Sequence, residues 1–181
     1  MATEIVKSTS ITNLDATPPL RGTHGISHRY GPTKAHGICA VTSGVTAAGA
    51  SYYRLVRVRS NSKIKHVWAW LSASSTTITG DIGIYYSDAP NLDGTQSINS
   101  AGGVINADHF ASAVALAAVV TPTEYTFEAG TYLGADMELP LWNTAASGLT
   151  TDPGGFFDIV FTLTSTAGAA AIVNLEVEYD Y

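Results

Sequence analysis

The chain has 181 residues, a formal net charge of −6 and a single cysteine. Charged residues make up 13% of the sequence, about half the ~25% that is usual in soluble proteins. The single cysteine excludes an intrachain disulfide, and the negative charge argues against nucleic acid as the main partner, because affinity for nucleic acid depends on neutralising phosphates. The first residues lack the pattern of a signal peptide and no apolar run approaches the ~20 residues of a membrane span, so we expect synthesis in the cytoplasm and no membrane partner.

The first fifty residues differ in composition from the rest of the chain. The stretch NLDATPPLRGTHGISHRYGPTKAHGI holds three prolines and four glycines and shows no sustained strand or helix period. It predicts an extended, irregular N-terminal arm over residues 1–50, which ends in the small-residue linker TSGVTAAGAS.

From Ser51 onwards, short segments with alternating apolar and polar residues are separated by turns rich in Gly, Pro, Asn and Asp. This pattern predicts an all-β domain over residues 51–181, an antiparallel β-sandwich of about eight strands. Near the C-terminus, the apolar residues at 157, 159, 161 and 163 predict one inward face, and those at 173, 175, 177 and 179 predict another. The candidate strands, in chain order, are 53–59, 63–72, 77–86, 104–106, 114–120, 125–128, 131–142, 156–165 and 170–181.

Basic residues are concentrated in one short segment of the sequence. Residues 54–65, RLVRVRSNSKIK, hold five of the nine basic residues, and no Lys or Arg follows them, whereas thirteen of the fifteen acids do. A turn at 60–62 predicts a hairpin in which Arg57 lies opposite Lys65 and Arg59 lies opposite Lys63. Like charges that face each other destabilise a strand pair.

The last two strands predict a second hairpin in which like charges face each other, and here the charges are negative. A hairpin whose loop lies near Gly168 places Asp158 opposite Glu176, and two further acids follow in the last strand. We therefore expect the two hairpins to meet, within one subunit or between subunits, so that basic residues lie near acidic ones. The charge-matching residues are Arg57, Arg59, Lys63, Lys65, Asp158, Glu176, Glu178 and Asp180.

No residue pattern predicts catalysis, and we do not expect an enzyme. The sequence has no G-x-S-x-G motif, and Cys39 lies in the apolar context GICAV, which is typical of a buried small residue. Asp108 and His109 are adjacent, but neighbours on a strand point to opposite faces and cannot form a catalytic dyad.

Two groups of residues raise the question of a metal ion. His24, His28 and His36 lie in the predicted arm with no Cys or carboxylate between them, whereas zinc needs three or four converging ligands. The loop SDAPNLDGTQS offers oxygen atoms on Asp88, Asn91 and Asp93 but lacks the regular spacing and the following Glu of a calcium loop. We expect polar contacts of the arm and an ordinary turn, with no metal and no cofactor.

The tryptophans are compatible with two roles, glycan binding and structural packing. Trp68, Trp70 and Trp142 can stack on sugar rings, as a carbohydrate-binding sandwich requires. Trp68 and Trp70 share a strand face with Ile64, which favours packing in the core or at an interface. Buried tryptophans favour a structural role, and exposed ones favour glycan binding.

The segment ITGDIGIYYSDAPNLDGTQSINSAGGVINADHFASAVALAA resembles a pattern in small virion proteins of tailed bacteriophages. The pattern is a strand that ends D-[IV]-G-[IV]-Y, a turn with D-G, and then I-[ND]-A-D-x-F-A-S-A. It matches this sequence at residues 81–85, 93–94 and 105–113. The resemblance covers residues 50–181 and leaves out the arm.

The resemblance implies a capsid decoration (cement) protein with a jelly-roll or related sandwich fold, located on the capsid surface of the virion. In a jelly roll the first barrel strand lies beside the last, which would place residues 53–59 beside 171–181 and bring Arg57 and Arg59 near Glu176 or Glu178. The partners implied are the major capsid protein and further copies of the chain, in a dimer or a trimer. The alternative is a phage tail or receptor-binding protein that holds glycan.

In that class of protein, the arm is the element that we expect to contact the partner. Its proline and glycine residues can shape it to another surface, and it has few acids to neutralise its basic residues. The arm residues expected to make protein contacts are Arg21, His24, His28, Arg29, Tyr30 and Lys34.

Overall fold

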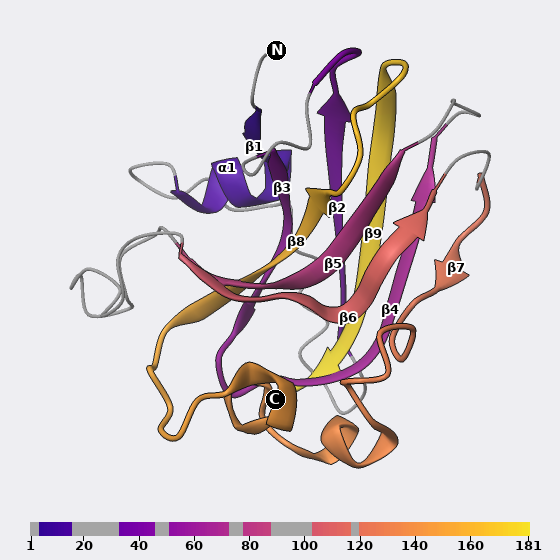
Figure 1. Cartoon of the computed structure of the whole chain (residues 1–181). Coiled ribbons are helices and arrows are strands. Elements are labelled where there is room, and N and C mark those ends of the chain that lie inside the picture. The colour runs from indigo at the N-terminus through magenta and orange to yellow at the C-terminus, as the bar shows by residue number, and fades with distance from the viewer. Residues whose placement is uncertain (1–3, 16–32, 46–50, 73–77, 88–102, 117–119) are drawn as a thin grey trace.

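The computed structural model of the chain describes residues 4–15, 33–45, 51–72, 78–87, 103–116 and 120–181. In these ranges nine strands form two packed sheets (Figure 1). The short helix α1 (Thr9–Asp15) precedes the second strand, and the 3-10 helices η1 (Gly134–Glu138), η2 (Leu141–Asn143) and η3 (Ala145–Ser147) lie between the seventh and eighth. The predicted all-β antiparallel sandwich is confirmed.

The strand order identifies the type of sandwich. The strands are β1 (Ile5–Lys7), β2 (Thr33–Val41), β3 (Tyr52–Arg59), β4 (Lys63–Leu71), β5 (Thr79–Tyr86), β6 (Val104–Ala115), β7 (Thr123–Glu124), β8 (Phe156–Leu163) and β9 (Ala171–Asp180). The first sheet has the order β1-β3-β8-β5-β6 and the second the order β2-β9-β4-β7. All pairs are antiparallel except β1 with β3. Without β1, two four-stranded sheets remain, and their order is that of a jelly roll.

The core lies between the two sheets and is filled by alternate residues of each strand. The two inward faces predicted for the last strands are confirmed, since all eight side chains are buried. They are Phe157, Ile159, Phe161 and Leu163 on β8, and Val173, Leu175, Val177 and Tyr179 on β9.

The prediction of an irregular arm is wrong for residues 33–41, which form β2 and pair with β9 along their whole length. Buried and exposed residues alternate strictly in β2, but the inward ones are small, so the apolar signal in the sequence is weak. Gly37 is one of them: a Cβ atom there would come closer than 3.0 Å to backbone atoms of Leu55. The small residues therefore allow β2 to lie close against β3.

The start of the predicted arm is also part of the sandwich. Strand β1 pairs in parallel with β3, and the backbone N–H of Ser8 donates to the carbonyl of Arg54 at 2.7 Å. Helix α1 follows directly and lies beside β3 (Figure 1). Residues 16–32 and 46–50 of the predicted arm lie outside the described residues.

Neither predicted hairpin forms, because each connection crosses from one sheet to the other. Strands β3 and β8 belong to the first sheet, whereas β4 and β9 belong to the second. The prediction that Arg57 faces Lys65, and Asp158 faces Glu176, is therefore wrong. Instead β3 pairs with β8 and β4 pairs with β9, so each basic strand lies beside an acidic one.

The region from 114 to 142 differs most from the predicted strands. Strand β6 runs unbroken over Val104–Ala115, and the segment predicted as a strand at 131–142 forms η1 and η2. Pro140 has no N–H for a sheet ladder, and local bonds satisfy the backbone instead, such as Asn143 N–H to the Pro140 carbonyl at 2.8 Å. Buried Tyr132 and Leu141 anchor this segment on the core.

Candidate interaction site

A buried ion network centred on Asp158 lies on the first sheet. Arg57 donates from Nε and Nη2 to the two Asp158 carboxylate oxygens at 2.6 and 3.0 Å. Arg54 Nη1 donates to Asp158 Oδ2 at 2.6 Å. The three side chains are 3% exposed or less. Two guanidinium groups thus share one carboxylate where water does not screen them.

A β-bulge places both arginines on the same side of β3. Residues three apart on a regular strand point to opposite faces, but the pairing with β8 shifts between Arg54 and Val56. Leu55 is the extra residue, and its carbonyl accepts a 2.6 Å hydrogen bond from Ser8 Oγ. Regular strand alternation predicts that Arg54 and Arg57 lie on different faces, so the sequence alone does not indicate Arg54 as a member of the network.

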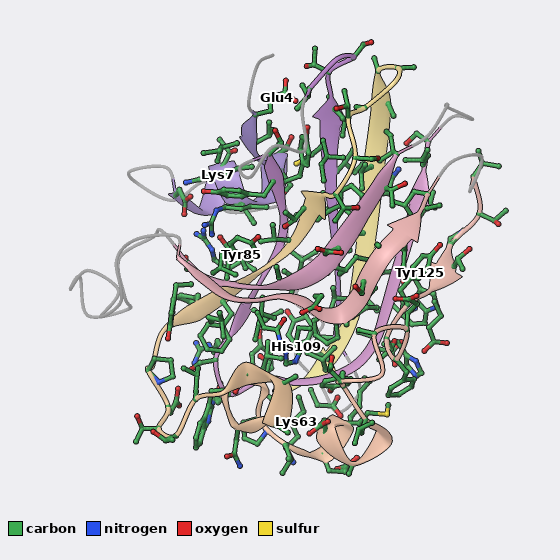
Figure 2. The ribbon with its side chains drawn as sticks, viewed as in Figure 1. Glu4, Lys7, Lys63, Tyr85, His109 and Tyr125 are labelled. Carbon is green, nitrogen blue, oxygen red and sulfur yellow. The ribbon has the colours of Figure 1, made fainter. Side chains whose placement is uncertain are left out.

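The network continues to the N-terminal elements. Asp15, at the end of α1, accepts hydrogen bonds from Arg57 and, at 2.7 Å, from Lys7 Nζ. Lys7 lies on β1, beside α1 (Figure 2). Burial disfavours the charged guanidinium of Arg57, but its hydrogen bonds and charge interactions with Asp158 and Asp15 outweigh this, and its pKa is raised. The ions therefore tie β1 and α1 to β3 and β8.

The expectation that Arg57 and Arg59 lie near Glu176 or Glu178 is wrong, because β3 and β9 lie in different sheets. The first barrel strand is β2, and it is β2 that lies beside the last strand. Arg59 instead has its guanidinium 5.8 Å from the centroid of the Tyr181 ring. Its side chain is exposed.

Three further charge-matching residues, Lys63, Lys65 and Asp180, lie where β4 begins and β9 ends. Lys63 lies opposite Asp180 in the register of β4 and β9. Lys65 Nζ donates to Glu138 at 2.7 Å and to the Met137 carbonyl at 2.9 Å, and it lies 3.9 Å from Asp180. Lys63 is thus at the end of the sandwich that carries η1 to η3 (Figure 2).

A second group of side chains covers the outside of the β2-β9-β4-β7 sheet. These residues, which we call the outer face, are Lys34, His36, His66, Trp68, Trp70, Glu124, Glu176 and Glu178. Lys34 Nζ lies 2.9 Å from Glu176, 3.5 Å from Glu178 and 4.6 Å from the centroid of the Trp68 ring. The hydrogen bond to Glu176 outweighs the effect of burial and raises the pKa of Lys34.

Two histidines stack on the tryptophans of the outer face. His36 lies 5.2 Å from Trp70 with ring planes 7° apart, and His66 lies 5.1 Å from Trp68. His66 Nδ1 is also 2.7 Å from Glu124 Oε1, and this hydrogen bond is the main reason that the pKa of Glu124 is lowered. All three tryptophans are half-buried, with Trp142 apart from the others on η2.

Most of the predicted arm residues fall outside the described part of the chain. These are Arg21, His24, His28, Arg29 and Tyr30. Lys34 is described, and it lies on β2 rather than in an arm. Asp88, Asn91 and Asp93 of the loop weighed for calcium are also outside the described residues.

The other candidate side chains lie in surroundings that suit packing. Cys39 is buried, which raises its pKa to about 12, and its Sγ lies 3.7 Å from the Arg54 carbonyl. His109 points from β6 toward η1 to η3, next to Thr144 and Tyr132 (Figure 2). Its ring is fully buried, and burial lowers its pKa to about 4. Across the described ranges, no three His, Cys, Asp or Glu side chains are grouped so as to hold a metal ion.

The chain matches a chain from the capsid of Ralstonia phage GP4 with a TM-score of 0.53 and 14% sequence identity, over 97% of both chains. The protein is similar in fold to a phage capsid chain. A chain from the capsid asymmetric unit of cyanophage Pam1 also matches, with a TM-score of 0.39 and 16% identity, over 84% of this chain and 88% of that one.

No protein-family profile and no curated protein matches the sequence. In the part of the chain that the structure describes, no helix is long and apolar enough to cross a membrane. Because no sequence match is found, the similarity to the Ralstonia phage GP4 capsid chain is one of fold.

Proposed function

We propose that this chain is a structural protein of a phage virion, which binds the outer surface of the capsid and stabilises it by bridging capsid subunits. The observation that carries the proposal is the similarity of fold to the Ralstonia phage GP4 capsid chain along 97% of both chains. The sequence pattern at residues 81–113, which resembles small virion proteins of tailed phages, supports the same class.

In this proposal the chain acts by binding, without catalysis or a cofactor. Its partners are the major capsid protein and further copies of itself, in a dimer or a trimer, and they include neither nucleic acid nor membrane. It is made in the host cytoplasm and resides on the capsid surface. Apolar burial supplies most of the binding energy, and charge sets register and specificity.

We assign the capsid contact to residues 16–32, a segment with Arg21, His24, His28, Arg29 and Tyr30 but no acid. Lys34 is no longer assigned to this contact, because it is paired within the second sheet. Strands β1 and β2 pair within the sandwich, and α1 is bonded to it through Asp15. Deletion of everything before residue 36 would therefore damage the fold as well as the contact, so substitutions within 16–32 give the cleaner test.

The location of the chain in the virion tests the proposal directly. Purified particles of the phage that carries the gene are analysed by mass spectrometry and labelled with a gold-conjugated antibody against the chain. We expect the label over the capsid surface, and we expect shells that lack the chain to melt at a lower temperature until purified chain is added. Absence of the chain from the particles, or label confined to the tail, contradicts the proposal, and tail label supports the glycan-binding alternative.

The arm assignment has a matched control in the chain. The double variant R21Q/R29Q and the double variant R59Q/K63Q remove the same charge, one from segment 16–32 and the other from the sandwich. Cosedimentation with shells that lack the chain should be lost in R21Q/R29Q and kept in R59Q/K63Q. Equal binding of the two variants rules the arm assignment out.

A further inference from the structure

The outer face holds a cation in a defined slot. The ammonium group of Lys34 lies over the Trp68 ring, 4.6 Å from its centroid, and pairs with Glu176 at 2.9 Å and Glu178 at 3.5 Å. An aromatic ring and two carboxylates thus surround one positive charge, an arrangement that combines cation–π attraction with ion pairing. The side chain of Lys34 is 54% exposed, so this slot is open to solvent.

The outer face carries more negative charge than Lys34 neutralises. Glu124 joins Glu176 and Glu178 to give three carboxylates against one ammonium group. The side chains of Glu124 and Glu176 are 43% and 31% exposed. Trp70 adds a second half-buried indole on the same face. A sheet face with two indoles and surplus carboxylates is complementary to a cationic partner.

We propose that the outer face binds an extended segment of a second polypeptide that carries arginine side chains. Each guanidinium group lies flat against Trp68 or Trp70 and pairs with Glu176, Glu178 or Glu124, displacing Lys34 from Trp68, or His36 from Trp70, where they compete. Arginine fits better than lysine because its planar group stacks on an indole and pairs with a carboxylate at the same time. The proposal rests on the proposed function only for the expectation that the chain has a protein partner.

The stacking contacts favour this occupant over a glycan. A sugar ring binds to an indole face that is free, but the Trp68 ring is already in contact with both Lys34 and His66. An arginine side chain can take the place of Lys34 at the Trp68 ring, so that Glu176 and Glu178 still have a positively charged partner. A neutral sugar that displaced Lys34 would leave Glu176 and Glu178 without their cation.

The test is nuclear magnetic resonance of the full chain with a defined probe. The probe is the peptide acetyl-Gly-Ser-Arg-Gly-Arg-Ser-Gly-amide, and its control has citrulline, the neutral isostere, in place of both arginines. The three indole N–H signals are assigned from single Trp-to-Phe variants. We expect the arginine peptide to shift the signals of Trp68 and Trp70, to leave that of Trp142 unchanged, and the citrulline peptide to shift none.

Two variants of the outer face should change the affinity in opposite directions. K34Q vacates the slot and should strengthen peptide binding by about threefold, whereas E176Q/E178Q should weaken it by about tenfold. E128Q/D152N removes two exposed carboxylates elsewhere and should leave the affinity unchanged. A purely structural role of Lys34 predicts no gain of binding in K34Q.

Several outcomes overturn the proposal. Equal shifts with the citrulline peptide exclude recognition of charge, and shifts of Trp68 and Trp70 with cellohexaose alone identify a glycan site. A dimer in sedimentation that E176Q/E178Q dissociates shows that a second copy covers the face. If the chain is found on virions but the arginine peptide does not bind, only this inference fails. If the peptide binds but the chain is absent from virions, only the proposed function fails.

Discussion

Gly37 of β2 lies so close to Leu55 of β3 that a Cβ atom at position 37 would come within 3.0 Å of three Leu55 backbone atoms. The two residues belong to different sheets, and their backbones meet at the edge where β2 passes the bulge of β3. Side-chain layers normally keep packed sheets ~10 Å apart. Here the edge of the sandwich closes by backbone contact.

Substitution of Gly37 by alanine should destabilise the fold. The added methyl group meets backbone rather than a flexible side chain, so β2 or β3 has to shift, at a cost of about 2–4 kcal/mol. Urea unfolding monitored by tryptophan fluorescence measures the loss. Gly134→Ala is the control, because a Cβ atom there meets nothing within 4 Å. Equal unfolding midpoints for the two variants would contradict the close approach of β2 to β3.

Replacement of Asp158 by asparagine should be severely destabilising. It leaves the buried guanidinium groups of Arg54 and Arg57 without their shared carboxylate, a situation that typically costs about 3–5 kcal/mol. The unfolding free energy in urea measures the effect. Glu138→Gln breaks the pair with Lys65 at an exposed site and is expected to leave the midpoint unchanged. A stable, cooperatively folding Asp158→Asn protein would show that the network matters little for stability.

Acid should destabilise the protein partly through His109. Its pKa is about 4 in the folded state against 6.5 for the ordinary group, because burial disfavours the charged ring. The unfolded chain therefore binds this proton first, and stability falls as the pH drops from 6.5 toward 4, by up to about 3 kcal/mol. We expect His109→Gln to lose less stability between pH 7 and pH 4.5 than the unsubstituted chain. An equal loss in both proteins would exclude this role.

The thiol of Cys39 should be unreactive in the folded protein. Burial raises its pKa to about 12, so almost no thiolate is present at pH 8 and reagents have no access to the sulfur. A colorimetric disulfide reagent should modify it in 6 M urea and only at the rate of unfolding in buffer. Rapid modification of the native protein would show that β2 detaches readily from the sandwich.

The fold class could be predicted from the sequence because alternation along β8 and β9 is carried by large apolar residues. Strand β2 was missed because the same alternation is carried by Thr33, Ala35, Gly37 and Cys39, which bury little apolar surface. Their small size is needed for the contact with β3, and that contact is not visible in a single sequence.

The contacts of the candidate sites could also be predicted only in part from the sequence. Sorting of charge along the sequence correctly indicated that basic and acidic strands meet, but it assigned the wrong partners. Two features decide the partners: the β3 bulge, which places Arg54 beside Arg57, and the crossing of each connection between sheets. Asp15 and Glu124 were also missed, because their partners Arg57 and His66 are brought to them by tertiary structure. No local sequence pattern predicts the β3 bulge or the crossing of the connections between the sheets.

The position of β9 between β2 and β4 has a consequence for synthesis on the ribosome. Lys34 and Glu176 are 142 residues apart in sequence, and Arg54 and Asp158 are 104 apart. Until the ten residues of β9 have emerged, β2 and β4 have no strand between them and expose their edges. Contacts of such long sequence separation make folding slow. The nascent chain therefore remains incompletely folded, and vulnerable to aggregation or to capture by a chaperone, until β9 has left the ribosome.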